Sequence, residues 1–117
     1  MGGLEVLLVE DDTDLRLVFA EALRDAGLVV HEAGHGQHAL DLIDGGVRPA
    51  LILLDIVMPV MDGFAFLRRK KQIHYLASVP VIVVSATAEP PIEGVCCVIR
   101  KPVEPATLLS ALVAWAA

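Results

Sequence analysis

The sequence predicts a doubly wound α/β domain built on a parallel β-sheet, and three observations support this fold class. Short, nearly continuous apolar runs rich in β-branched residues alternate with segments of helical periodicity, and such runs are typical of strands buried on both faces. Short connections between these segments favour right-handed βαβ units. A length of 117 residues suits one core of ordinary size, so we expect a single domain over residues 1–117.

Five apolar runs are the predicted strands. They cover residues 5–9, 29–33, 50–54, 81–85 and 96–99. The last run begins with the adjacent cysteines Cys96 and Cys97. Neighbours on a strand point to opposite faces, so these thiols are poorly placed to bond to each other, and their spacing is not that of a zinc site. We interpret both as small apolar residues of a buried strand.

Four segments are predicted as helices, over residues 13–26, 36–44, 62–72 and 104–115. The first carries apolar residues at intervals of three and four and ends at Gly27, a residue that commonly terminates helices. In the third, Phe64, Leu67 and the stem of Lys71 mark one side of the helix, which we expect to face the core.

The composition excludes several classes of partner. The formal net charge is −6, whereas nucleic acids and anionic lipids are bound by clusters of Lys and Arg. The one basic run, residues 68–71, is interpreted as the solvated end of a helix, where cations suit the dipole. No signal peptide is recognisable, and the apolar run 50–61 is interrupted by Asp55 and Pro59. We therefore expect a cytoplasmic protein with no direct nucleic-acid or membrane partner.

Polar residues follow four of the predicted strands. These are Glu10, Asp11 and Asp12 after the first strand, Asp55 after the third, Ser85 after the fourth and Lys101 after the fifth. In parallel sheets the carboxyl ends of the strands share one rim, which is where ligands bind. We therefore expect these side chains to converge.

The converging residue types indicate phosphoryl transfer. Clustered carboxylates repel one another and need a cation or raised pKa values, and a set of oxygen ligands suits Mg²⁺. A carboxylate nucleophile, a metal, a lysine and a hydroxyl together provide positioning and charge neutralisation for a phosphoryl group. The plainer alternative is that Glu10, Asp11 and Asp12 only cap the first helix and that Lys101 is a surface lysine. Asp12 and Asp62 are themselves interpreted as helix caps.

Other phosphate-binding folds fit the strand ends poorly. A dinucleotide-binding fold needs a glycine-rich turn after the first strand, where this chain is acidic, and there is no P-loop motif. A phosphatase of the haloacid dehalogenase type also uses an aspartate after a strand, but its second aspartate would fall at Val57.

Four short motifs follow predicted strands in order: LVEDD at residues 8–12, LDIVMPVMDG at 54–63, VSA at 84–86 and RKP at 100–102. They resemble the acidic pocket, the phosphorylation loop, the hydroxyl-bearing strand end and the lysine-proline turn of the receiver domains of two-component response regulators. The resemblance covers essentially the whole chain. It implies a five-stranded parallel sheet in the flavodoxin-like order 2-1-3-4-5, with helices on both faces.

The resemblance also implies residue roles. Asp55 would be the phosphoacceptor, and Ser85 and Lys101 would bind the phosphoryl oxygens. Mg²⁺ or Mn²⁺ would be held by Glu10, Asp11, Asp55 and the backbone carbonyl of Val57. The domain would accept its phosphoryl group from a histidine kinase or a histidine phosphotransfer protein and change its contacts with a downstream protein. It would assist its own phosphorylation and dephosphorylation and would not be an enzyme with external substrates.

The sequence departs from the family between Ser85 and Lys101, where a full helix usually lies. Tandem prolines at residues 90–91 resist a helix interior, so we expect the fourth helix to be reduced or absent. A second hypothesis is a phosphorylation-independent docking module with the same fold, and the presence of every expected site residue argues against it. The apolar segment 108–117, which carries Trp115, could also pair with a second copy and form a homodimer.

Overall fold

A parallel sheet of five strands forms the centre of the computed structural model, which describes residues 3–87 and 91–116. The strands are β1 (Glu5–Val9), β2 (Val29–Ala33), β3 (Leu51–Leu54), β4 (Val81–Ser85) and β5 (Cys97–Arg100). Their order across the sheet is β2-β1-β3-β4-β5, and every neighbouring pair is parallel. The predicted fold class and strand order are thereby confirmed, with shifts of one residue at the ends of β3 and β5.

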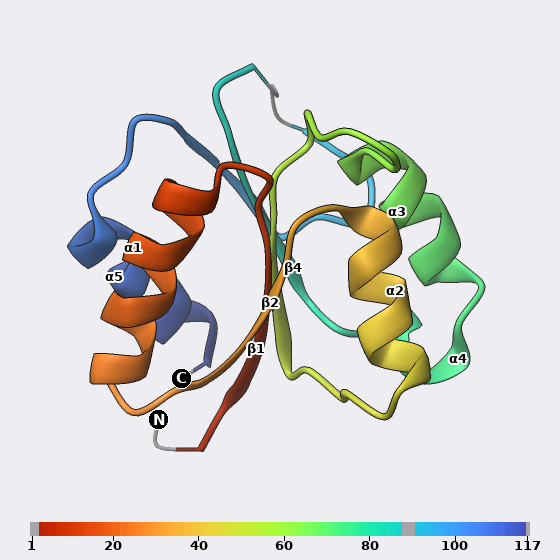
Figure 1. The fold of residues 1–117 in the computed structure, drawn as a ribbon, viewed down its shortest axis with the longest axis horizontal. Coiled ribbons are helices and arrows are strands. Elements are labelled where there is room, and N and C mark those ends of the chain that lie inside the picture. The colour runs from red at the N-terminus through yellow and green to blue at the C-terminus, as the bar shows by residue number, and fades with distance from the viewer. Residues whose placement is uncertain (1–2, 88–90, 117) are drawn as a thin grey trace.

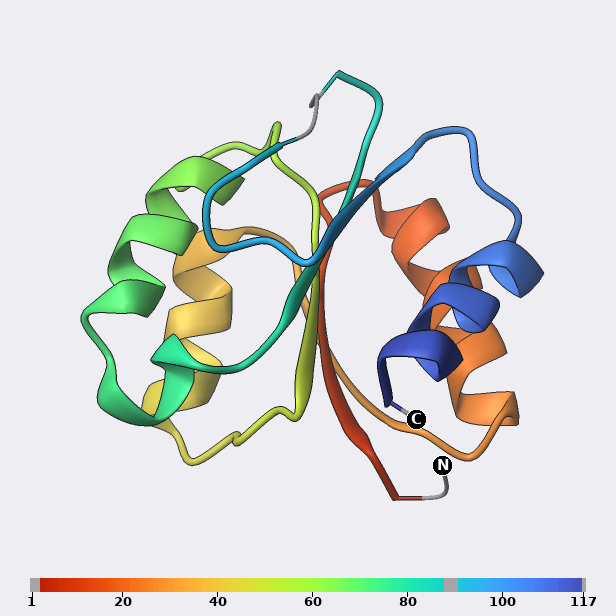
Figure 2. The same ribbon diagram turned by 180° about the vertical axis from the view of Figure 1, so that it is seen from behind.

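Helices cover both faces of the sheet. They are α1 (Thr13–Asp25), α2 (Gly36–Asp44), α3 (Gly63–Lys71), α4 (His74–Ala77) and α5 (Pro105–Ala116). Figure 1 shows α1 and α5 on one face and α2, α3 and α4 on the other, and the view from behind in Figure 2 shows the same division. The short α4 was not predicted, because its four residues are too few to show a helical period. No helix in the described ranges is long and apolar enough to span a membrane.

The connection from β4 to β5 contains no helix within its described residues, 86–87 and 91–96. This agrees with the expected reduction of the family's fourth helix, although residues 88–90, which include the first of the tandem prolines, lie outside the described part of the chain. The element labelled α4 is a different feature, because it precedes β4. The β4–β5 crossover is therefore a loop wherever the structure describes it.

Two apolar clusters, one on each face, hold the layers together. The first joins α2, α3 and α4 to the sheet, and the second joins α1 and α5 to it. The predicted core side of α3 is right for Leu67 and wrong for Phe64 and Lys71. Phe66, Leu67 and Lys70 are buried, whereas Lys71 is exposed and Phe64 is 45% exposed. Lys70 is accommodated because its Nζ donates to the carbonyl oxygen of Ala77 at 2.9 Å, at the end of α4.

The adjacent cysteines, of which Cys97 begins β5 and Cys96 precedes it, are less buried than predicted. Cys96 and Cys97 are free thiols, as expected, but both are only partly buried. Their strand is an edge of the sheet, and its burial is incomplete from end to end. A strand at an edge lacks the second neighbour that would cover it, which explains the difference from a fully buried strand.

The segment that joins β3 to α3 is tightly packed because Gly63 has no side chain. Its N–H donates to the carbonyl oxygen of Ile56 at 2.8 Å. A Cβ on Gly63 would lie 2.6 Å from the backbone oxygen of Asp55, closer than real contacts allow. Only glycine therefore lets α3 begin directly against the end of β3, which fixes the backbone on either side of Asp55.

We expect Gly63→Ala to lower the free energy of unfolding by about 2 kcal/mol or more, because the backbone must move away from Asp55. The matched control is Gly45→Ala, at a helix end where φ is −78° and the nearest atom would lie at 3.4 Å. That variant should stay within about 0.5 kcal/mol of the parent. Urea denaturation measures both, and equal losses would contradict the explanation by close approach.

Candidate functional site

The carboxyl ends of the strands meet at the upper edge of the sheet in Figure 1. The N–H of Asp55 bonds the carbonyl oxygen of Val9 at 3.0 Å, and the N–H of Lys101 bonds the carbonyl oxygen of Ser85 at 3.0 Å. These backbone bonds extend the pairing of β1 with β3 and of β4 with β5 by one step beyond the strands. The residues predicted to converge therefore do so because the sheet aligns their strand ends.

A three-member ionic network lies at the centre of this rim. Lys101 Nζ donates to Glu10 Oε1 at 2.5 Å and to Asp55 Oδ2 at 3.1 Å. The second oxygen of each carboxylate also has a donor, since the N–H of Ile56 bonds Asp55 Oδ1 at 2.7 Å and the N–H of Asp12 bonds Glu10 Oε2 at 3.1 Å. Glu10 is 2% exposed and Asp55 is 6% exposed, so full hydrogen bonding is what makes their burial tolerable.

Three carboxylates gather close enough to share a cation. Glu10, Asp11 and Asp55 each place one oxygen within 4.8 Å of the others. Glu10 and Asp55 are buried and Asp11 is exposed, so the group opens to solvent on one side. An all-oxygen ligand set with an open side suits Mg²⁺, which keeps several of its waters. Val57, two residues after Asp55, is 63% exposed on the same loop.

The electrostatics of the rim show a shortage of positive charge. Burial raises the pKa of Glu10 to about 7, and the nearby charge of Asp55 adds to this, against the lowering effect of bonds from Lys101 and the backbone of Asp12. Burial by itself would lower the pKa of Lys101, but Glu10 and Asp55 outweigh it and the pKa is raised. Lys101 bonds Glu10 and Asp55 but not Asp11 among the three grouped carboxylates, and a divalent cation would supply further positive charge.

Two aspartates near the ionic network act as helix caps and are not part of the network. Asp12 caps α1 by accepting from the N–H of Leu15, and Asp62 caps α3 by accepting from the N–H of Ala65, as predicted. The alternative that the acidic run only caps a helix is therefore right for Asp12 and does not describe Glu10, whose carboxylate meets Lys101.

The fourth strand ends beside the network. Ser85 is 1% exposed, and its hydroxyl accepts from the N–H of Thr87 at 3.3 Å. The hydroxyl therefore lies at the start of the β4–β5 connection. The peptide bond between Lys101 and Pro102 is cis.

Sequence reasoning missed one residue that supports the rim. Arg16 on α1 donates from Nη1 to the carbonyl oxygen of Glu10 at 2.7 Å, and its Nε lies 3.4 Å from Glu32 Oε1 at the end of β2. The arginine thus fixes the backbone that presents Glu10. A positively charged residue in the first turns of α1, where acidic residues are the favourable choice, was the available signal.

The sequence also matches a known family. Residues 6–113 match the profile described as the response regulator receiver domain. The chain belongs to this family. The match extends over both apolar clusters and over every residue of the rim described above.

Curated relatives match this chain over part of their own length. The sensor kinase CckA of Brucella abortus is 38% identical over 89 residues, which are 75% of this chain and 9% of CckA. An uncharacterised 14.6 kDa protein of Leptolyngbya boryana is 32% identical over 88 residues, 75% of this chain and 66% of that protein. The chain therefore spans a small fraction of the first relative and just under two thirds of the second.

Solved structures superimpose on nearly the whole of this chain. The chemotaxis response regulator CheY4 of Vibrio cholerae superimposes with a TM-score of 0.87 at 29% identity, covering 96% of this chain and 98% of that one. The receiver domain of the sensor histidine kinase PA1611 of Pseudomonas aeruginosa gives a TM-score of 0.86 at 29% identity, covering 97% and 98%. That structure is described with a magnesium ion coordinated in its active site cleft.

The raised pKa of Glu10 predicts a pH-dependent stability in metal-free protein. Between the unfolded pKa of 4.5 and about 7 the native state binds more protons than the unfolded state, so this stabilisation is complete at low pH and is lost as pH rises through that window. Glu10→Gln should flatten the slope of unfolding free energy against pH over this window, a difference of about 1–3 kcal/mol.

Urea denaturation in a chelator, at pH values across this window, measures the slopes. Glu21→Gln is the matched control, since it removes an exposed carboxylate from α1. An unchanged slope in Glu10→Gln would show that Glu10 does not titrate in the window.

Proposed function

We propose that this receiver domain accepts a phosphoryl group on Asp55 from a phosphohistidine donor. The observation that carries the proposal is the approach of Lys101 Nζ to Asp55 Oδ2 at 3.1 Å, beside the grouped oxygens of Glu10 and Asp11. An aspartate whose carboxylate is held in one orientation, next to a cation and further oxygen ligands, is the arrangement that a carboxylate nucleophile needs. A P–O bond to Asp55 would form as the P–N bond of the donor breaks, and the departing imidazole would take up a proton.

Each rim residue has a proposed part in this reaction. Mg²⁺ or Mn²⁺ would be held by the carboxylates of Glu10, Asp11 and Asp55 and by the carbonyl oxygen of Val57. When bound, the metal supplies positive charge beside the transferring phosphoryl group. Lys101 and Ser85 would then bind the phosphoryl oxygens through ammonium and hydroxyl groups.

We infer that the phosphoryl donor approaches Asp55 from the face of the sheet that α1 and α5 cover. A groove of about 370 Å³ opens there beside the ionic network. It is lined by Leu15, Phe19, Ala86, Lys101, Pro102 and Val103. We infer that a histidine kinase or histidine phosphotransfer protein docks an apolar surface in this groove, because a docked donor would then lie next to Lys101, which contacts Asp55.

Acetyl phosphate with Mg²⁺ should add a single phosphoryl group to the protein, as seen by intact-mass spectrometry. Asp55→Asn should abolish the adduct, because the amide is not a nucleophile of this kind. Asp44→Asn, an exposed aspartate at the end of α2, should not. Chelation of the metal should also abolish it. An adduct that persists in Asp55→Asn would refute the assignment, and no adduct on the parent protein would favour the phosphorylation-independent docking module.

Leu15→Gln should weaken docking of a protein donor without changing the phosphorylation reaction at Asp55. We expect phosphotransfer from a histidine kinase that phosphorylates the parent protein to slow by about tenfold, since an apolar contact in the groove is lost. Labelling by acetyl phosphate should stay within about twofold, because a small donor needs no docking surface. The control is Val113→Gln, an exposed apolar residue on α5 that does not line the groove. Equal slowing with both donors would show that Leu15 acts through the rim instead.

A further inference from the structure

The β4–β5 crossover leaves part of the sheet thinly covered. Parallel strands are usually joined by a helix that packs on the sheet, and α1, α2 and α3 do this for the earlier connections. Within the described residues the last connection supplies only a loop. Ile92, Val95 and Val98 consequently pack against the α2 and α3 cluster while remaining partly exposed.

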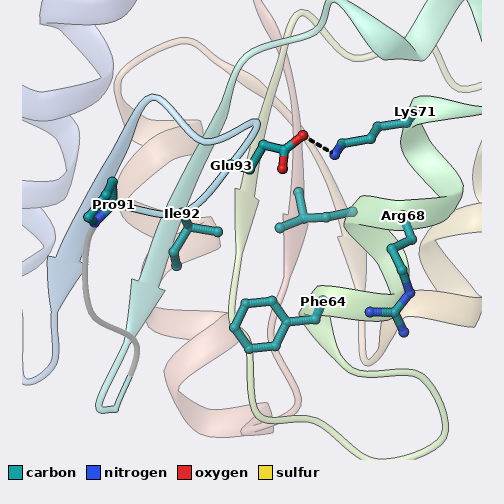
Figure 3. A pocket seen from close by; sticks show the side chains of 7 residues that line it. Phe64, Arg68, Lys71, Pro91, Ile92 and Glu93 are labelled. Atoms are coloured by element: carbon teal, nitrogen blue, oxygen red, sulfur yellow. Dashed lines mark hydrogen bonds and ion pairs between the residues drawn. The ribbon is translucent and has the colours of Figure 1, made fainter.

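A groove of about 400 Å³ runs between α3 and this loop. Its walls are Phe64, Leu67, Arg68 and Lys71 from α3, and Pro91, Ile92 and Glu93 from the loop. Figure 3 shows Phe64 and Ile92 on opposite sides of the groove, with the ion pair of Lys71 and Glu93, at 2.7 Å, across one end. The α3 residues recur at intervals of three and four, so they form one continuous stripe along the helix.

The charges of the groove favour an acidic occupant. Lys71 and Glu93 neutralise each other, which leaves Arg68 as the unpaired charge among the lining residues. Arg68 is exposed and has no hydrogen bond or ion pair with any other residue of the described chain. A guanidinium beside an apolar surface is suited to binding a carboxylate in a bidentate manner. The protein as a whole, with a net charge of −6, does not attract such a group.

We propose that this groove binds an amphipathic helix of a partner protein, with apolar residues on Phe64, Leu67 and Ile92 and a carboxylate on Arg68. A helix suits the groove because the stripe on α3 offers ridges spaced for helix packing, beside a crossover whose described residues, 86–87 and 91–96, form no helix. The stripe spans eight residues, from Phe64 to Lys71, so two to three turns of a partner helix cover it. This binding lies on the opposite face from the donor groove and needs no phosphoryl group on Asp55.

The test begins with a displayed library of helical peptides of about 15 residues, randomised along one face and selected against the unphosphorylated protein. We expect enriched peptides to combine apolar residues at i, i+3, i+4 and i+7 with one Asp or Glu. The best peptide, labelled and titrated by fluorescence anisotropy, should bind about tenfold more weakly to Arg68→Glu. Binding to Arg69→Glu should change by less than about twofold, because Arg69 is exposed on the same helix but does not line the groove.

Two further measurements test the position of the peptide: reversal of the charges of the peptide acid and Arg68, and mapping of amide chemical shifts. The peptide with its acidic residue changed to Lys should bind Arg68→Glu better than the parent protein, and amide shifts should concentrate on Phe64, Leu67 and Ile92. Equal effects of Arg68→Glu and Arg69→Glu, shifts located elsewhere, or no enrichment would overturn the proposal. Self-association by sedimentation that Arg68→Glu removes would also overturn it, with a second copy as the occupant. Repeating the titration with Asp55→Asn keeps the result independent of the phosphoacceptor proposal.

Discussion

The ionic network of Lys101 with Glu10 and Asp55 is the constraint on which the rim depends. β1 and β3 are neighbours in the sheet, so their ends bring two buried carboxylates together, and these would repel each other without a cation. The cation comes from beyond β5, across the full width of β4. Strand order, parallel direction and the register of β4 with β5 must all be correct for Lys101 to reach both acids. The same network remains short of positive charge, which makes the rim receptive to a divalent ion.

Close backbone contacts hold one side of this rim rigid. Gly63 lets α3 begin against the end of β3, and the N–H of Gly36 bonds the carbonyl oxygen of Met61 at 3.0 Å, joining the start of α2 to the same loop. A Cβ on Gly36 would lie 2.8 Å from Met61 Cγ. The loop that carries Asp55 is therefore held between two helix starts. Such close packing favours the preorganisation that a reactive group needs.

Much of the architecture was readable from the sequence, because strand and helix patterns are local and strand ends in a parallel sheet share one rim. The features that the sequence did not predict depend on side-chain packing or on contacts between residues far apart in the chain. In α3 the run Phe64, Ala65, Phe66, Leu67 offers two apolar stripes, and the cap at Asp62 together with the tertiary contacts of Phe66 and Lys70 decides which one is buried. The bond from Lys101 to Glu10 joins residues 91 positions apart, and no local pattern reveals its geometry.

The exposure of Phe64 and Lys71, which the sequence placed on the core side of α3, goes with a β4–β5 connection that is a loop wherever the structure describes it. Phe64 and Lys71 line the groove between α3 and this loop, so a pattern that looks like a core face forms the wall of a groove. The groove and the rim are also the two ends of one connection, since Thr87 bonds the Ser85 hydroxyl where it starts and Ile92 lines the groove before it enters β5. If a helix bound at Ile92 restrains this connection, linkage requires two factors to be equal: the one by which phosphorylation of Asp55 changes the affinity for the helix, and the one by which helix binding changes the phosphorylation equilibrium of Asp55.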